Sequence, residues 1–323
     1  MRPPFLGILL AILAATATLP QPVHATTIAV TTTTDELNTN GNCSLREAVR
    51  AANTNVAVDA CPAGENNQTD TITVPAGTYT LTVVGNDNDG TAGDLDILGN
   101  SAVDDLVISG AGAATTIIQA CAVEQLSGDC PAGQGVADRV LYVRDAHVAI
   151  SGVTIRHGRA PSQNGTRTGS GIWMQQAFSL PALTLTDVVV TKNGDTAGDL
   201  RSEGGGIANW NGPLTLTRVT ISDNKATSGG GILNQSSESV LVMTDSTVSG
   251  NTALAGGGIY NESNAVATLT NSTISGNRAG NSGDRYSPNG AGLYNFNSTA
   301  TLTGCTVSDN VAPGKGGGIV NSG

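Results

Sequence analysis

LTLTRVTISDN (residues 214–224), with GGGILN close behind it (229–234), is the stretch that decides the fold. Leucine, valine and isoleucine alternate in the first phrase with threonine and serine, which is the two-residue period of a strand that is buried on one face. The glycines and asparagines of both phrases are typical of tight turns. The stretch therefore predicts short strands joined by turns and excludes a helical unit.

Both phrases recur along the second half of the chain. Copies of the Gly-rich phrase are GGGIAN (204–209), GGGILN (229–234), GGGIYN (256–261), GAGLYN (290–295) and GGGIVN (316–321), and GSGIWM (169–174) is a degenerate earlier copy. The spacing between copies is mostly 25 to 27 residues. A propeller blade needs about 40 residues, whereas about 25 residues accommodate three short strands and three turns. The repeat predicts an all-β fold, a single-stranded right-handed parallel β-helix, or solenoid, whose coils stack about 4.8 Å apart.

The repeat also predicts which side chains face the core. Leu214, Leu216, Val219 and Ile221 are expected to point inward. Aligned asparagines are expected to stack as two ladders, one through Asn224 and the other through Asn234 and their equivalents in other coils.

The N-terminal segment CSLREAVRAAN (43–53) has the pattern of a short amphipathic helix. Ser44 and Glu47 have the spacing of a capping box, and Asn53 is expected to end the helix. An open solenoid end exposes core residues and unpaired strand edges, so we predict that this helix caps the first coil.

The same segment resembles the CSLREA-domain proteins, which are bacterial exported β-helical proteins named for the hexapeptide at 43–48. The resemblance extends to TDTITVPAGTYTL (69–81), GDLDI (93–97), DRVLYV (138–143) and VAISGVTIRHG (148–158). The later Gly/Asn repeats resemble pectin-lyase-like β-helices and the repeats of polymorphic outer-membrane proteins. The resemblance implies the fold and export, and it assigns no catalytic residue. It also implies a further C-terminal portion, so we expect the chain to be truncated at that end.

The N-terminal residues and the charge of the chain indicate where the protein acts and which partners it lacks. Residues 1–25 have the arginine, apolar run and small-x-small ending of a secretory signal, so we predict a secreted or cell-surface protein. The N-terminal strand and capping helix are expected in 26–68 and the solenoid in 69–323. The formal charge of −11 argues against nucleic acid as a partner, and no later segment is long and apolar enough to span a bilayer.

Five cysteines in an exported chain suggest disulfides. Cys43 with Cys61 and Cys121 with Cys130 are the sequence-local pairs, which leaves Cys305 over; the spacing alone leaves other pairings open.

Two further residue sets are candidate binding sites. Asp87, Asp89, Asp94 and Asp96 surround Gly90 and could ligate Ca²⁺, the one cofactor that the sequence suggests, although a polar turn explains the same residues. Trp173, Tyr260 and Tyr294 occupy one position of the Gly-rich phrase, which predicts an aromatic stripe for a glycan or a surface protein; aromatic enrichment in strands is the alternative.

No cluster of charged residues in the repeats predicts catalysis. We therefore expect a non-enzymatic, adhesin-like or structural module. The alternative is a carbohydrate-active β-helix enzyme, either a polysaccharide lyase or a glycoside hydrolase. The Thr-x-Thr ranks of the repeats also raise ice binding as a minor alternative.

Overall fold

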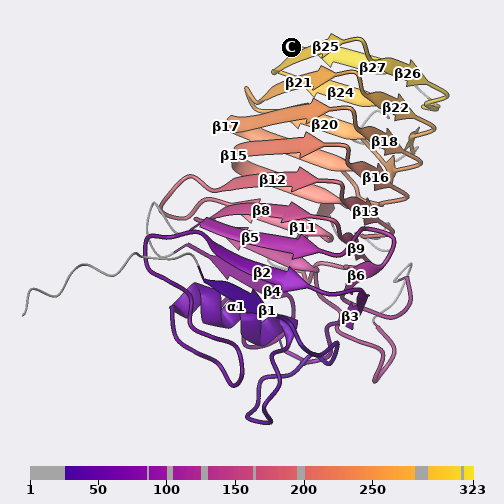
Figure 1. Cartoon of the computed structure of the whole chain (residues 1–323). Helices are drawn as coiled ribbons and strands as arrows, with labels where there is room; N and C mark the ends of the chain where they lie inside the picture. Colours follow the sequence, from indigo (N-terminus) through magenta and orange to yellow (C-terminus); the bar gives the residue numbers. More distant parts are fainter. Residues whose placement is uncertain are drawn as a thin grey trace, which may run out of the picture.

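The computed structural model describes residues 26–85, 87–99, 105–124, 130–162, 165–194, 201–280, 290–313 and 316–323. The predicted secretory signal lies outside these residues. Figure 1 shows the chain winding into stacked coils, with the only helix of the described residues, α1, at the N-terminal end. All named strand pairs are parallel, which confirms the parallel β-helix.

Each complete coil places one strand on each of three faces. The first face holds β4 (Leu95–Leu98), β7 (Leu141–Arg144), β11 (Ile172–Gln175), the first parts of β15 (Ile207–Thr217) and β17 (Ile232–Thr244), β20 (Ile259–Glu262), β24 (Leu293–Phe296) and β27 (Ile319–Ser322). The second face holds β1 (Thr27–Ala29), β2 (Asp70–Val74), β5 (Asp105–Gly110), β8 (His147–Ser151), β12 (Ala182–Thr186), the last parts of β15 and β17, β21 (Val266–Thr270) and β25 (Thr299–Thr303). Because β15 and β17 run through the corner without a break, these two faces form one continuous sheet.

The third face is a separate sheet of short strands. It holds β3 (Gly77–Thr80), β6 (Thr116–Gln119), β9 (Thr154–Arg156), β13 (Val189–Thr191), β16 (Thr220–Ser222), β18 (Thr247–Ser249), β22 (Thr273–Ser275) and β26 (Thr306–Ser308). Two minor pairs lie on the turns between the third and first faces, namely β10 (Thr166–Thr168) with β14 (Arg201–Glu203) and β19 (Thr252–Ala253) with β23 (Arg278–Ala279).

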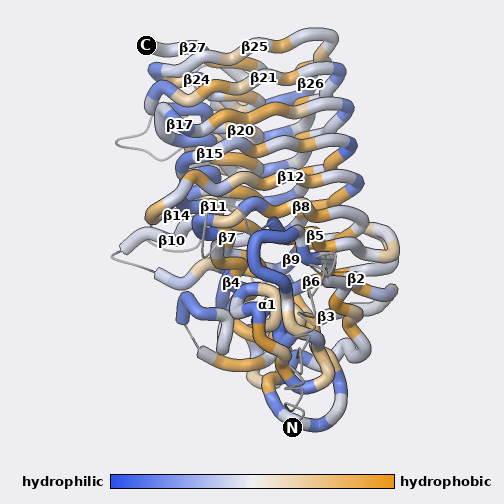
Figure 2. The backbone as a smooth tube through the Cα atoms, turned by 60° about the vertical axis from the view of Figure 1, so that its left-hand side comes forward, coloured by the Kyte–Doolittle hydropathy of each residue, from blue (hydrophilic) through white to orange (hydrophobic). Residues whose placement is uncertain are grey.

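The core is a stack of aliphatic side chains that repeat from coil to coil. Leu214, Leu216, Val219 and Ile221 are all buried, as the alternation predicted. Figure 2 shows the resulting pattern, in which apolar positions recur at the same place in successive coils. Because the strands are in register, each side chain packs on its equivalent one coil away.

Two buried asparagine ladders stabilise the turns. In the first, the Oδ1 of Asn251 accepts hydrogen bonds from the backbone N and Nδ2 of Asn224, and its Nδ2 donates to the carbonyl of Ile221 and to Asn277 Oδ1. The second ladder runs through Nδ2 to Oδ1 bonds of 2.7 to 2.8 Å and joins Asn209, Asn234, Asn261, Asn295 and Asn321. The asparagines therefore satisfy buried polar groups at corners where strand pairing ends.

The Thr-x-Thr ranks lie on the second face in register but are not continuous. Thr215 pairs with Val242, and Val242 pairs with Thr268, so a valine interrupts one rank. Ice binding by this face remains a prediction.

Helix α1 (Leu45–Thr54) closes the N-terminal end of the core, and its capping box is present as predicted. The predicted end at Asn53 is wrong, because the helix continues to Thr54 and the left-handed residue is Asn55. Asn53 instead reaches the first face, where its side chain donates to the Asp96 carbonyl and accepts from the Leu98 backbone N. Asn53, which the local sequence pattern predicted as the end of the helix, therefore makes a tertiary contact instead.

Disulfides join Cys43 to Cys61 beside α1 and Cys121 to Cys130 in a loop after β6, and Cys305 is a free thiol. Within the described ranges, no helix has both the length and the apolarity to cross a membrane.

Candidate binding cleft

A cleft of about 420 Å³ opens on the first face, over β11, β15 and β17, beside the turns that carry β10 and β14. Its lining residues are Arg139, Pro161, Thr166, Thr168, Trp173, Gln175, Arg201, Glu203, Trp210 and Gln235. A second hollow of about 300 Å³ shares Trp210 and Gln235 with it and adds Asn211, Ser236 and Ser263. The two together form a groove that crosses several successive coils.

Strand alternation explains which side chains reach this groove. Ile172 and Met174 are buried in the core, so Trp173 and Gln175 point outward from the same strand. One coil on, Ala208 pairs with Trp173 and Trp210 pairs with Gln175. The next coil places Gln235 beside Trp210. Two outward-facing columns of side chains therefore form the floor of the groove. One runs through Trp173 and Ala208, and the other through Gln175, Trp210 and Gln235.

The aromatic part of the floor is tightly packed. Trp173 stacks on Tyr142 with ring centroids 4.8 Å apart, and Trp210 meets Trp173 edge-on at 5.6 Å with perpendicular planes. Ala208, the small neighbour of Trp173, packs in the same cluster. The Tyr142 hydroxyl donates to Gln175 Oε1, which leaves the amide Nε2 of that glutamine as its remaining polar group.

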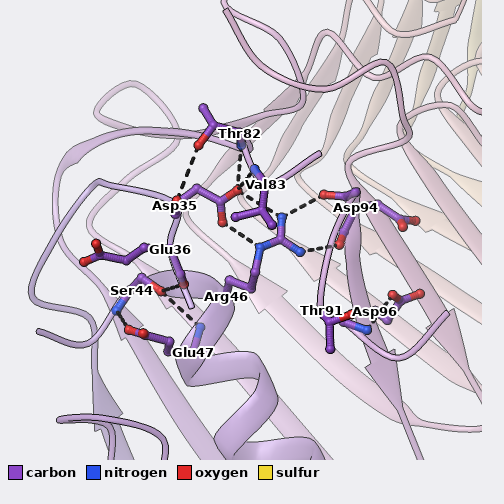
Figure 3. Close-up of polar contacts among 12 residues, drawn as sticks. Asp35, Glu36, Ser44, Arg46, Glu47, Thr82, Val83, Thr91, Asp94 and Asp96 are labelled. Atoms are coloured by element: carbon purple, nitrogen blue, oxygen red, sulfur yellow. Dashed lines mark hydrogen bonds and ion pairs between the residues drawn. The ribbon is translucent and has the colours of Figure 1, made fainter. Parts of the chain in front are cut away.

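Arg139 joins this aromatic cluster to the N-terminal cap. Its guanidinium carbon lies 4.8 Å from the Trp173 ring centroid, and its Nη1 is 3.2 Å from Asp94 Oδ2. Figure 3 shows the other side of Asp94, where Arg46 of α1 donates to the backbone carbonyls of Gly93 and Asp94 and pairs with Asp35 at 2.7 Å. A continuous set of buried contacts thus runs from α1 to the cleft.

The carboxyl groups beside Arg139 are held in an environment that favours their neutral form. Burial raises the pKa of Asp94 well above its usual range and also raises that of Asp138, against the opposing charge of Arg139. Burial raises the pKa of Asp96 to about 7, although its Oδ2 accepts a hydrogen bond from the Gly90 backbone.

A second set of ionisable residues lies where the turn that carries β14 borders the cleft. Arg201 Nε lies 2.7 Å from Glu203 Oε1. Burial raises the pKa of Glu203, Arg201 opposes the rise, and nearby Glu262 adds to it. Burial likewise raises the pKa of Glu262, which hydrogen-bonds to Tyr260. Two carboxyl groups and one arginine thus interact at this edge of the groove.

Several buried polar atoms around the cleft have no hydrogen-bond partner within the described part of the protein. They are Arg139 Nε, Trp173 Nε1, Trp210 Nε1 and Gln235 Oε1. Buried polar atoms are nearly always paired in folded proteins, so their concentration at one place marks it as a candidate ligand site.

The predicted aromatic residues fall in two places. Trp173 lines the cleft, but it is only 6% exposed. Tyr260 and Tyr294 stack on each other at 4.9 Å, three and four coils further on. Ala208 and Leu233, which separate the two groups, are fully buried. The expected exposed stripe along the solenoid is therefore wrong, because its column is interrupted and largely covered.

The predicted calcium residues have partners in the protein. Asp94 pairs with Arg139, Asp96 accepts from Gly90, and Asp87 accepts from Thr91 Oγ1 at 2.6 Å. Asp89 accepts a hydrogen bond from the Thr91 backbone. No group of three or more His, Cys, Asp or Glu side chains placed to hold a metal occurs among the residues that the structure describes. Calcium binding by these aspartates remains a prediction.

Sequence reasoning missed most of the cleft. Gln175, Trp210, Gln235 and Glu262 form one column, two residues after the aromatic position of each Gly-rich phrase. The two-residue period of a strand places both positions on one face, and this signal could have found them. Arg201 and Glu203 precede a Gly-rich phrase in a turn of variable length, and no repeat pattern marks them.

The sequence matches the family described as the right handed beta helix region over residues 107–323. No curated protein matches the sequence. Among solved structures, the pectin methyl esterase of the rice weevil aligns with 86% of this chain and 81% of its own, at 15% identity and a TM-score of 0.35. The family match spans most of the chain and agrees with the coils described above, and so the chain belongs to the right-handed β-helix family.

Proposed function

We propose that this protein is a glycan-binding β-helix module and that the cleft around Trp173 and Trp210 is its saccharide site. The observation that carries the proposal is the composition of this cleft, in which perpendicular indole rings lie beside two amides and an arginine–glutamate pair. Aromatic faces pack against the apolar faces of sugar rings, and a few placed polar groups bind hydroxyls. The groove extends over several coils, which suits a chain of sugars.

We further propose that the protein is an exported bacterial protein of the CSLREA type, secreted or held at the cell surface in an adhesin-like role. The support is the signal-like pattern of residues 1–25 together with the hexapeptide at 43–48. The structure gives this hexapeptide a physical role in that Ser44 and Glu47 cap α1 while Arg46 binds the loop before β4.

Substitution of Trp210 tests the binding site. Trp210→Ala removes a half-buried ring from the groove, so we expect affinity for a recognised oligosaccharide to fall at least about tenfold. Phe178→Ala is the matched control, because Phe178 is 94% exposed and lies outside the cleft. Calorimetric titration with a panel of neutral and acidic oligosaccharides is the measurement. Equal loss in both variants, or no binding by the unsubstituted protein, would reject the proposal.

A carbohydrate-active enzyme is the second candidate, and the paired carboxyl groups of Glu203 and Glu262 favour it. Carboxyl groups with raised pKa values serve as acids in glycoside hydrolysis. New reducing ends or unsaturated products released from a bound polysaccharide, and lost in Glu203→Gln, would support this candidate. Binding without product release by the unsubstituted protein would reject it.

A further inference from the structure

We propose that the cleft recognises an acidic sugar and that its N–H groups bind the carboxylate. The inference rests on the proposed function, because it names the class of glycan that the same site takes. It is carried by an excess of hydrogen-bond donors over free acceptors.

The donors of the cleft come from several elements. Arg139 precedes β7, Trp173 and Gln175 lie on β11, Arg201 lies on β14, and Trp210 lies on β15. Guanidinium and indole groups only donate, and the Tyr142 hydroxyl already occupies the Gln175 oxygen. The carboxylate of Glu203 is bound to Arg201. A carboxylate, which only accepts, therefore complements these donors better than a sugar hydroxyl, which brings a donor as well as acceptor sites.

The unpartnered atoms give independent support. Three of the four are donors, namely the Nε of Arg139 and the Nε1 atoms of the two indoles. Arg139 and Trp173 are more than nine-tenths buried. Leaving such groups without partners costs free energy, and a carboxylate with two oxygens can accept from two or three of them. Small side-chain rotations of the kind common on binding bring the indole edges to the ligand.

The arrangement of charge agrees with an anionic ligand. Arg139 is flanked by Asp94 and Asp138, whose burial raises the pKa of both carboxyl groups. Arg139 lines the cleft and its Nε has no partner within the described part of the chain, so the guanidinium can stabilise an incoming carboxylate. The two indole planes are perpendicular, so a sugar that lies flat against one ring meets the edge of the other.

The test compares matched acidic and neutral ligands. The probes are a tetramer of linked hexuronates and the same tetramer after its carboxyl groups are reduced to primary alcohols. Binding of both to the full chain is measured by calorimetry at neutral pH. We expect at least about tenfold tighter binding of the acidic tetramer, which is the gain typical of a charge-assisted hydrogen bond.

Two variants assign the effect to the cleft. Trp210→Phe keeps a ring but deletes one N–H, and Gln235→Glu keeps the shape but adds a negative charge. Each substitution is expected to weaken binding of the acidic tetramer about tenfold and to leave binding of the reduced tetramer nearly unchanged. The reduced tetramer thus controls for folding of each variant.

The possible outcomes separate the two proposals. Equal binding of both tetramers, or equal weakening of both by the variants, overturns the acidic-sugar inference and leaves the glycan site standing. Failure of both tetramers to bind, together with failure across the neutral panel, overturns the proposed function itself. Preference for a sulfated oligosaccharide over the hexuronate also overturns the carboxylate assignment.

Discussion

At the scale of single residues, buried polar side chains carry much of the specificity of this fold. The ladder asparagines repeat from coil to coil and are satisfied by their equivalents in adjacent coils. Asp94, Asp96 and Arg139, which have no such equivalents, are buried between the cap and the cleft. The repeated asparagines therefore stabilise the scaffold, whereas Arg139 contributes to the candidate site.

Asn251→Ala tests the asparagine ladder. The substitution removes four hydrogen bonds in a fully buried position and leaves the adjacent Asn224 without its acceptor. We expect the free energy of unfolding to fall by about 3 kcal/mol. Thr268→Ala on the exposed second face is the control and should change it by about 0.5 kcal/mol or less. Denaturant unfolding measures both, and a similar small loss in the two variants would contradict the role of the ladder.

Asp96 predicts a pH dependence of stability. Its folded pKa of about 7 exceeds its ordinary value of 3.8, so its stabilising contribution is complete in acid and is lost as pH rises through about 7. The free energy of unfolding should therefore decrease between pH 5 and pH 8 from this group. Asp96→Asn keeps an acceptor for Gly90 and a donor for Asp87, so it should remove part of that slope. An unchanged slope in the variant would assign the dependence to other carboxyl groups.

At the scale of elements, α1 is the part that the sequence predicted best and also the part whose end it misplaced. Its start depends on local contacts, the reciprocal bonds of Ser44 and Glu47, which a four-residue pattern reveals. Its end depends on Asn53, whose side chain binds β4. A contact over more than forty residues of sequence cannot be inferred from a local pattern.

Arg46→Gln tests the attachment of α1 to the solenoid. Arg46 is 1% exposed, and the substitution leaves Asp35 without its charged partner and two carbonyls without their donor. We expect a loss of about 3 to 5 kcal/mol in the free energy of unfolding. Arg50→Gln on the same helix is the control, because Arg50 is only half-buried. Calorimetric unfolding of both variants provides the comparison, and equal effects would show that Arg46 contributes no more than a surface arginine.

At the scale of the whole molecule, the repeat made the solenoid predictable and left the cleft unpredictable. Leu216 and Asn224 have equivalents in other coils, so one phrase determines their environment throughout. The cleft lining combines residues that occur once, such as Arg139 and Arg201, from parts of the chain about sixty residues apart. Their proximity follows from stacking of coils whose turns differ in length, and only the three-dimensional structure supplies those lengths.

Side chains alternate between the core and the groove along each strand of the first face, so mutations at neighbouring positions have different consequences. Ile207 and Ile232 point into the core and cannot change without loss of packing, whereas Trp210 and Gln235 share those strands and point outward. A mutation at an outward position changes the groove and leaves the neighbouring core contacts intact. Substitution at these outward positions therefore alters the surface that a ligand meets without rebuilding the fold.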